Sequence, residues 1–329
     1  MEFLYRAFKH QSKSYYWRFS LLLFLSCSLV IGCYSDGVTR VGETQECRPI
    51  EHALGETCVP LAPERIITLS NAALDSVLVL EMQPVGTISN TPELLRQRVQ
   101  GAEIVGMEGS ANLEKILSLQ PDLILGAAYS DGAIYEQLSQ IAPTVLEGAE
   151  TNGEWQDILL LNAEALGKQD RAQALLAEYQ RRLDLFREKM GERLTNLEVS
   201  LVRIYPDRIS VYLKNSFAGT ILQDAGLARP DYQDRGVFGE HPFQEVISKE
   251  ELQRADGDVL FVWTFGATPE ISRSAQAALE TFKQDPLWLQ LQAVQNNKVY
   301  EIDAYWNVPS LIAANAVVDD LFYYLLEQE

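Results

Sequence analysis

The sequence predicts an α/β protein made of two lobes with central, mostly parallel sheets, on either side of a long helical segment. Short β-branched runs alternate with stretches of helical spacing over residues 64–150, and the same alternation returns over residues 197–329. Alternation of this kind indicates βα units around a parallel sheet. Between the two regions, apolar residues recur at steps of three and four from Thr151 to Leu194, as in a helix with one buried face.

Length and composition set the first limits on the fold and its partners. A chain of 329 residues has room for two domains, and a hydrophobic content of 47% excludes a largely disordered protein. The formal net charge of −19 and the sequence pI of about 4.6 argue against nucleic acid as a partner, because basic side chains are too few to form a row of phosphate contacts. In so acidic a chain, arginines gathered at one place are informative.

The first 32 residues have the features of an export signal. Its basic residues are Arg6, Lys9, Lys13 and Arg18. The apolar stretch that follows, Phe19–Ile31, is 13 residues long and too short to span a membrane. The next residues complete the run Val-Ile-Gly-Cys at positions 30–33, which resembles the bacterial lipobox and predicts a lipid on Cys33. Ordinary cleavage with no lipid on this cysteine is the alternative.

Cys47 and Cys58 remain for pairing in the mature chain, since Cys27 lies in the signal. An exported protein folds in an oxidising compartment, so we expect these two cysteines to form a disulfide that closes an entry loop within a linker, residues 33–63. Two free thiols are the alternative. A metal site is disfavoured, because only His52 lies nearby and two cysteines with one histidine do not complete a zinc shell.

The first lobe, residues 64–150, is predicted as alternating strands and helices. The expected strands are Arg65–Leu69, Val85–Ile88, Ile104–Val105, Asp122–Gly126 and Thr144–Leu146. The expected helices are Ala72–Glu81, Asn112–Leu117 and Ile134–Ile141.

The central segment begins with a capping box, Thr151 with Glu154. At about 1.5 Å per residue, one unbroken helix from here to Leu194 would run on the order of 60 Å, which is long enough to span two lobes. Gly167 leaves a second possibility open, because one helix could end at Leu166 and another begin near Asp170. Local signals do not decide between the two.

The second lobe, residues 197–329, repeats the alternation. The expected strands are Glu198–Ile204, Ile209–Leu213, Asp258–Trp263 and Lys298–Ile302. The expected helices are Gly219–Ala225, Lys249–Arg254, Ala275–Lys283 and Ile312–Glu327.

Several short segments carry a family resemblance through their order and spacing. They are PERIITL at 63–69, PVG at 84–86, NLEKI at 112–116, LQPDLIL at 119–125, APTV at 142–145, ALGK at 165–168 and DPLW at 285–288. In these segments the chain resembles the iron-siderophore substrate-binding proteins of ABC importers, a group that includes cobalamin binders. The resemblance covers nearly all of residues 60–329. It implies two lobes joined by one rigid backbone helix, residues 151–196, with Gly167 as a tolerated kink and the ligand held in the cleft between lobes.

Candidate cleft residues follow from the strands, because ligands collect at the carboxyl ends of strands in open α/β sheets. In the first lobe this rule selects Asn71, Ser89, Asn90 and Tyr129. In the second lobe it selects Arg203, Tyr205, Trp263, Tyr305 and Trp306. The resemblance adds Arg235 and Phe243, from a loop-rich stretch that often contributes to the cleft in this family.

Arg203 with Tyr205 is the strongest predicted pair. A ferric siderophore presents outward oxygens that often carry negative charge and a hydrophobic rim, which suit a guanidinium group and an aromatic face respectively. For Arg203 the alternative is a surface ion pair. For Trp263 and Trp306 the alternative is packing in the core, where large aromatic side chains are common.

Two acidic residues gain a role only from the resemblance. Glu114 and Glu250, one in each lobe, match the carboxylates that dock on permease arginines in the resembled family. Without the resemblance, both would be interpreted as solvated helix residues.

The predicted function is therefore that of a monomeric, lipid-anchored binding protein that delivers a ferric siderophore to an ABC permease and its ATPase. We expect no cofactor and no bare-metal site, because His52 and the lone His241 are far apart. A corrinoid or haem binder of the same fold is one alternative, and a ligand-free surface adaptor is another. A two-lobed α/β enzyme is disfavoured, because the chain has no Gly-x-Ser-x-Gly elbow and no phosphate-binding glycine loop.

Overall fold

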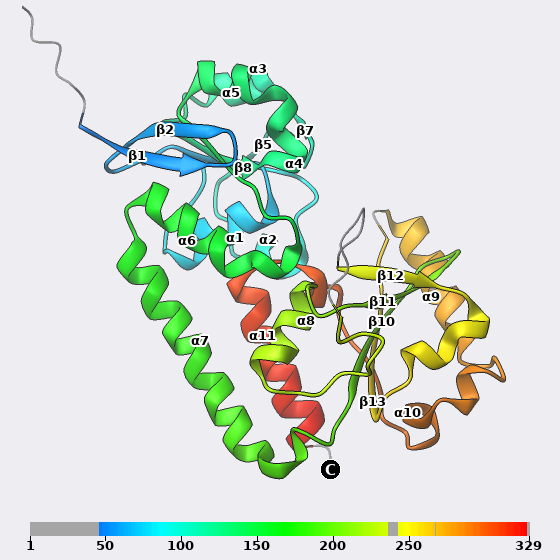
Figure 1. The fold of residues 1–329 in the computed structure, drawn as a ribbon. Coiled ribbons are helices and arrows are strands. Elements are labelled where there is room, and N and C mark those ends of the chain that lie inside the picture. Colours follow the sequence, from blue (N-terminus) through cyan, green and yellow to red (C-terminus); the bar gives the residue numbers. More distant parts are fainter. Residues whose placement is uncertain (1–45, 236–242, 267, 328–329) are drawn as a thin grey trace, which may run out of the picture. The chain divides into compact units, whose positions relative to one another are not determined.

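The computed structural model describes residues 46–235, 243–266 and 268–327, so the predicted signal, Cys33 and His241 lie outside the described residues. Two five-stranded sheets form the centres of two α/β lobes (Figure 1). The predicted fold class is confirmed.

All strands of the N-terminal sheet are parallel, in the order β5-β4-β3-β8-β9. The strands are β3 Ile66–Thr68, β4 Gly86–Thr87, β5 Glu103–Ile104, β8 Leu123–Ala127 and β9 Thr144–Glu147. Every residue of β3, β8 and β9 is buried, as expected for parallel strands covered on both faces. The lobe also contains α1 Asn71–Val79, α2 Glu93–Arg96, α3 Leu113–Ser118, α4 Ala128–Asp131, η1 Gly132–Ile134, α5 Tyr135–Ile141 and a small hairpin, β6 Gly106–Met107 with β7 Ser110–Ala111.

The C-terminal sheet is mixed, in the order β12-β11-β10-β13-β14. β10 Val199–Ile204, β13 Val259–Thr264 and β14 Val299–Glu301 are parallel neighbours. β11 Ile209–Tyr212 runs antiparallel to both of its neighbours, β10 and the edge strand β12 Gln244–Ile247. The helices are α8 Phe217–Asp224, η4 Lys249–Ala255, α9 Pro269–Phe282, η5 Trp288–Gln290, α10 Gln292–Gln295, η6 Ala304–Asn307, α11 Leu311–Phe322 and the π-turn η7 Tyr323–Glu327. The sequence did not predict the edge strand β12.

The central segment contains the predicted long helix, but that helix is shorter than expected. The capping-box turn η2 Asn152–Glu154 leads into α6 Trp155–Leu166, and the long helix α7 Gln169–Met190 follows, continued by η3 Gly191–Arg193. Gly167 ends α6 in the left-handed region at φ 67°. Figure 1 shows α6 and α7 as two helices that meet at a corner. Gly167 is thus a helix end, which the prediction of a tolerated kink missed.

The predicted entry loop is a β-hairpin, β1 Cys47–His52 with β2 Gly55–Pro60. Cys47 and Cys58 form the disulfide across it, with their Cα atoms 5.5 Å apart. Ile50 and Val59 are fully buried in the same core cluster as Trp155 of α6. The hairpin therefore joins the core through these two side chains, although its strands mix charged and apolar residues.

Arg48 of the hairpin holds the end of α6. Its Nη1 donates to the carbonyls of Glu164, at 3.1 Å, and Ala165, at 3.3 Å, and its Nη2 donates to Leu61 O. Glu164 and Ala165 lie in the last turn of α6, where a helix leaves carbonyls without an intrahelical partner. A Cβ added to Gly167 would lie 2.8 Å from Arg48 Nη2, so the close approach depends on glycine.

Asp75 links the two lobes through a carboxylate at a helix N-terminus. It lies on α1, is 2% exposed, and accepts hydrogen bonds from the backbone N–H groups of Leu311, at 2.9 Å, and Ile312, at 3.1 Å, at the start of α11. Burial is the largest influence on its pKa, which is raised to about 6, while the two N–H groups and Ser310 act in the opposite direction. This carboxylate thus caps a helix more than 230 residues away in the chain.

We expect Gly167→Ala to lower the free energy of unfolding by about 1–2 kcal/mol, because alanine is strained at positive φ and its Cβ would displace Arg48. Gly101→Ala is the matched control, since Gly101 also has positive φ, at 72°, but a Cβ there meets nothing within 4 Å. Urea unfolding of both variants measures the difference. Equal losses in the two variants would show that the Arg48 contact contributes nothing.

The pKa of Asp75 predicts a pH-dependent stability. In the folded state the pKa of Asp75 is raised to about 6. The contribution of Asp75 to stability is therefore complete below the pKa of the unfolded state and is lost as pH rises through 6. The unfolding free energy of the wild type minus that of Asp75→Asn should therefore be larger at pH 4 than at pH 7, by up to roughly 3 kcal/mol. Urea titrations across this range measure it, and a constant difference would contradict the assignment.

Candidate functional site: an arginine stack and an acidic wall

Arg203 lies near the carboxyl end of β10 within a group of aromatic side chains. Its guanidinium carbon is 4.1 Å from the ring centroid of Tyr205 and 5.4 Å from that of Phe265, and Arg208 lies 3.8 Å from the Tyr205 ring. We call these four residues the arginine stack. Arg203 Nη1 donates to the hydroxyl of Tyr212 at 3.2 Å, which fixes the direction of the guanidinium group.

Among the described residues, no carboxylate pairs with Arg203. Within the described ranges, its Nη2 donates only to a carbonyl, that of Phe265 at 3.4 Å, and its buried Nε has no partner. Arg208 pairs with Asp207 at 3.3 Å, but both side chains are exposed. An exposed ion pair of this kind is weak. The described residues therefore do not neutralise the positive charge of the arginine stack.

Two predicted cleft residues, Trp263 and Trp306, lie in the core. Trp263 is 1% exposed and its ring is 4.7 Å from that of Tyr212, while Trp306 is fully buried. Trp306 Nε1 and the hydroxyl of Tyr305 both donate to the Asp320 carboxylate, at 2.7 and 2.5 Å. These contacts direct the two side chains toward α11, so we do not retain Trp263, Tyr305 or Trp306 as ligand contacts.

Strand register places Arg203 and Glu245 on opposite faces of the C-terminal sheet. Arg203 pairs with Ser210 of β11, so these two side chains lie on the same face of the sheet. Tyr212, two residues further along β11, shares that face and pairs with Gln244 of β12. Because side chains alternate between faces along a strand, Glu245 lies on the opposite face from Arg203. This edge of the sheet therefore has two chemically different sides.

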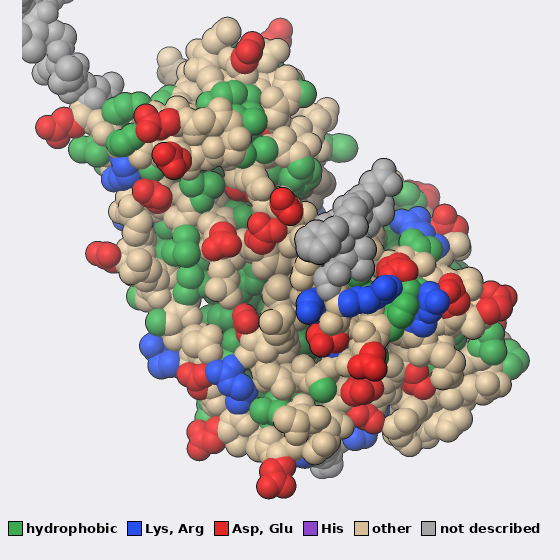
Figure 2. Space-filling view, in the orientation of Figure 1, with side chains coloured by type: hydrophobic (Ala, Val, Ile, Leu, Met, Phe, Trp, Pro, Cys, Tyr) green, Lys and Arg blue, Asp and Glu red, His purple; other side chains and the backbone are tan. Residues whose placement is uncertain are grey.

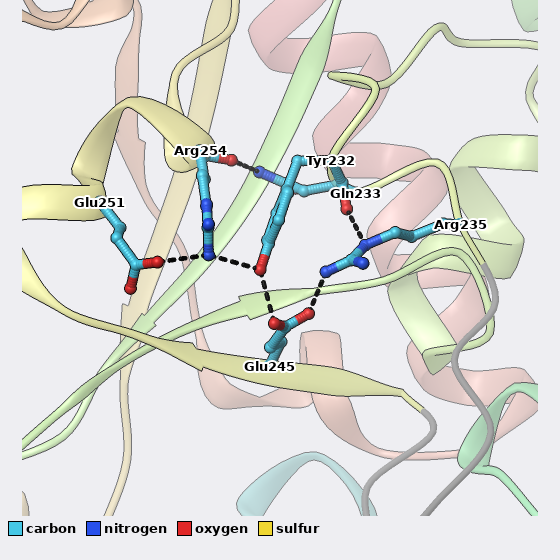
Figure 3. A network of polar contacts seen from close by, with 6 residues as sticks. All are labelled: Tyr232, Gln233, Arg235, Glu245, Glu251 and Arg254. Carbon is cyan, nitrogen blue, oxygen red and sulfur yellow. Dashed lines mark hydrogen bonds and ion pairs between the residues drawn. The ribbon is translucent and has the colours of Figure 1, made fainter.

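Arg235 belongs to the opposite side. Its Nη2 pairs with Glu245, whose other oxygen accepts the hydroxyl of Tyr232 at 2.5 Å, and Arg254 donates to the same hydroxyl at 2.9 Å (Figure 3). Arg235 and Arg254 also lie 4.0 and 4.5 Å from the Tyr232 ring centroid. Since Glu245 neutralises Arg235 on the face away from Arg203, we remove Arg235 from the candidate site.

In the N-terminal lobe, three predicted residues gather around an acid that the sequence did not single out, Glu108. The hydroxyl of Tyr129 donates to Glu108 Oε1, and Asn71 Nδ2 approaches Oε2 at 3.4 Å. Asn90 Oδ1 accepts the backbone N–H of Glu108 at 3.0 Å, which holds the β6–β7 turn. Tyr129 is 75% exposed, so this group, which we call the acidic wall, is open to solvent on one side.

Burial is the main cause of the raised pKa values in and near the acidic wall. It raises the pKa of Glu108, the hydrogen bond from Tyr129 opposes this, and the charge of Asp131 adds to the rise. The pKa values of Asp131 and Glu147 are raised for the same main reason.

In Figure 2, most visible charged side chains of the N-terminal lobe are acidic, whereas basic side chains form a row across the C-terminal lobe.

The two remaining predicted cleft residues lie apart from these groups. Ser89 lines a separate cavity of about 210 Å³ together with Thr87, Arg96 and Ile104. Phe243 is half-buried, and its ring lies 6.2 Å from that of Tyr212, on the Arg203 side of the lobe. Phe243 therefore stays a candidate beside the arginine stack, and Ser89 does not join the acidic wall.

The predicted docking acids are both exposed. Glu114 is in the first turn of α3, and Glu250 is in the first turn of η4. Neither forms an ion pair or side-chain hydrogen bond with another described residue. Both carboxylates are thus available to an external partner.

The structure adds two negative findings for the described ranges. Residues 46–235, 243–266 and 268–327 contain no group of three His, Cys, Asp or Glu side chains that could hold a metal ion. In the same part of the chain, no helix is both long and apolar enough to cross a membrane.

Sequence reasoning missed Glu108, Arg208 and Phe265. Phe265 directly follows β13, so the rule of strand carboxyl ends could have found it. Arg208 opens β11, which runs antiparallel, and Glu108 lies in a two-residue turn between very short strands. Neither position carries a periodic signal.

Comparisons with known proteins identify the family. The family model described as "Periplasmic binding protein" matches residues 66–306. A Bacillus subtilis (strain 168) protein named "Probable siderophore-binding lipoprotein YfiY" is 32% identical over 321 residues, which cover 93% of this chain and 97% of that protein. The "Fe(3+)-citrate-binding protein YfmC" of the same organism is 31% identical over 292 residues, 86% of this chain and 87% of the relative.

A solved structure agrees with the fold. The crystal structure of Staphylococcus aureus SirA complexed with staphyloferrin B matches with a TM-score of 0.76 and 28% identity, over 84% of this chain and 98% of that one. Its architecture is that of the class III periplasmic binding proteins, with two α/β lobes and a long helix between them in sequence. The chain belongs to the periplasmic binding protein family.

Proposed function

We propose that this protein is the substrate-binding lipoprotein of an ABC importer, and that it captures a ferric siderophore between its lobes and delivers it to the permease. The observation that carries the proposal is the unneutralised charge of Arg203 within the arginine stack. The names of the relatives support the ligand class, since they refer to siderophore and Fe(3+)-citrate binding.

The arginine stack suits a ferric chelate with anionic oxygens. Arg203 and Arg208 offer charge-assisted hydrogen bonds, while the rings of Tyr205 and Phe265 offer apolar faces to the rim of the chelate. Tyr212 holds Arg203 in place before the ligand arrives, so little side-chain freedom is lost on binding. A corrinoid, whose ring substituents are neutral amides, would have no comparable need for two arginines, and no described feature favours a catalytic reaction.

Delivery requires a membrane location and a docking surface. We propose that cleavage after residue 32 leaves a lipid on Cys33, that the anchored protein acts as a monomer outside the plasma membrane, and that Glu114 and Glu250 contact permease arginines. Their exposure and lack of partners support this role. The relatives named as lipoproteins support the anchor.

Removal of the Arg203 charge should weaken binding of ferric citrate. A charge-assisted hydrogen bond contributes about 1.5–3 kcal/mol, so Arg203→Gln should raise the Kd between about tenfold and about a hundredfold. Intrinsic fluorescence titration with ferric citrate, iron-free citrate and cobalamin measures this and tests the ligand class. Tight binding of cobalamin instead of ferric citrate would overturn the proposal.

Arg254→Ala is the matched control for this titration. Arg254 also lies over a tyrosine ring, that of Tyr232, but in the network around Glu245 on the opposite side of the sheet. Its loss should leave the Kd for ferric citrate within about twofold of the wild type. Equal effects of the two substitutions would show that the arginine stack has no special role.

Charge reversal at the docking acids should separate transport from binding. Glu114→Lys and Glu250→Lys should each reduce ligand-stimulated ATP hydrolysis by the permease complex in proteoliposomes several-fold, because like charges would face each other, and should leave the Kd for ligand unchanged. Glu188→Lys, on the exposed side of α7 and without an ion pair among the described residues, is the control. Full stimulation by both docking variants would refute the role.

A further inference from the structure

Glu108 has an environment that a purely anionic ligand does not explain. It is half-buried, its oxygens receive the Tyr129 hydroxyl and approach the Asn71 amide, and none of the described lysines or arginines pairs with it. A partly buried carboxylate is stabilised by hydrogen bonds, and more strongly by a cationic partner. The acidic wall therefore lacks a positive charge.

A second observation points to a missing donor at the same place. Asp131 is fully buried, lies near enough to Glu108 for its charge to raise the pKa of Glu108, and has one carboxylate oxygen, Oδ1, without a hydrogen-bond partner. Its other oxygen accepts from Ala127 N and Ser130 Oγ. The side-chain oxygen of Asn71 is also buried without a partner. Asp131 and Asn71 thus carry acceptor oxygens near Glu108 that the described residues leave unused.

The wall is open at the carboxyl end of a strand, where ligands bind in this class of fold. Tyr129 follows β8 by two residues and is 75% exposed, so its ring lies at the surface beside the half-buried Glu108. In the other lobe the arginine stack offers donors and positive charge. A ligand bound between the two lobes, as in the proposed function, would meet positive charge from one lobe and negative charge from the other.

We propose that Glu108 is a specificity-determining residue that selects ferric chelates bearing an ammonium group on the side away from their anionic oxygens. The proposal rests on the proposed function and refines its ligand class. The ammonium group donates to Glu108, the phenol of Tyr129 covers its methylene neighbours, and the anionic oxygens reach Arg203 and Arg208. A chelate with anionic groups on both sides is disfavoured, because it places like charges against Glu108.

The test uses two synthetic chelators that differ in one group. Both are bis-citryl amides, one built on bis(3-aminopropyl)amine and the other on 1,7-diaminoheptane, so a protonated secondary amine in the first replaces a methylene in the second. Their ferric complexes share the same anionic core. Wild-type protein should bind the amine-containing complex about tenfold more tightly, as measured by isothermal titration calorimetry.

Glu108→Gln removes the charge and keeps an oxygen that can accept from Tyr129. In this variant the two Kd values should differ by less than about twofold, with an unchanged midpoint of urea unfolding. Glu136→Gln is the matched control, because Glu136 is an exposed acid of the same lobe without an ion pair or side-chain hydrogen bond among the described residues. It should keep the tenfold preference.

The possible outcomes distinguish a failure of the Glu108 proposal from a failure of the proposed function. Equal binding of both complexes by the wild type, with both affinities lost in Arg203→Gln, would overturn the role of Glu108 and leave the proposed function standing. A preference that persists in Glu108→Gln would also overturn it. Failure of the wild type to bind either complex would count against both proposals.

Discussion

The positive charge of Arg203, left without a carboxylate partner among the described residues, is the feature on which the functional interpretation depends. In a chain with a formal charge of −19, an arginine near many acids would be expected to form an ion pair. The structure instead surrounds it with aromatic rings and the hydroxyl of Tyr212. Such surroundings keep the guanidinium group in place without neutralising it, which is the state that an anion-binding group needs.

The scaffold holds the two lobes in place through several polar contacts. Gly167 and Arg48 fix the end of α6, so α7 begins in a defined direction, and Asp75 joins α1 of one lobe to the first turn of α11 of the other. These are polar contacts with strict geometry, supported by a continuous core cluster that includes residues of both lobes. A scaffold tied at several points limits how far the lobes can move, so recognition depends on side chains that are already placed.

Much of the fold followed from periodicity, because strands and helices in an α/β lobe carry strong apolar patterns. The strands Asp122–Gly126 and Glu198–Ile204 were predicted within a residue or two of their observed bounds. Gly167 was misjudged because a glycine inside an apolar stripe gives the same local signal whether it bends a helix or ends it. The hairpin from Cys47 to Pro60 was missed because its short strands mix charged and apolar residues.

The candidate site was only partly predictable for a different reason. The rule of strand ends places a residue near the cleft, but it does not say to which side its side chain points. Tyr129 is exposed and Arg203 is half-buried, whereas Trp263 and Trp306, at equivalent positions in the sequence pattern, complete the core. The pairing of Arg235 with Glu245 depends on strand register, and the group around Glu108 depends on a short turn. Neither is visible in a local window of sequence.

The measurement that bears most directly on the central claim is native mass spectrometry of the protein purified from iron-starved cells that produce it. The account predicts a bound small molecule that contains iron, carries a net negative charge as the ferric complex, and is absent from Arg203→Gln purified in the same way. A bound corrinoid or haem, or an iron chelate retained equally by wild type and variant, would contradict it.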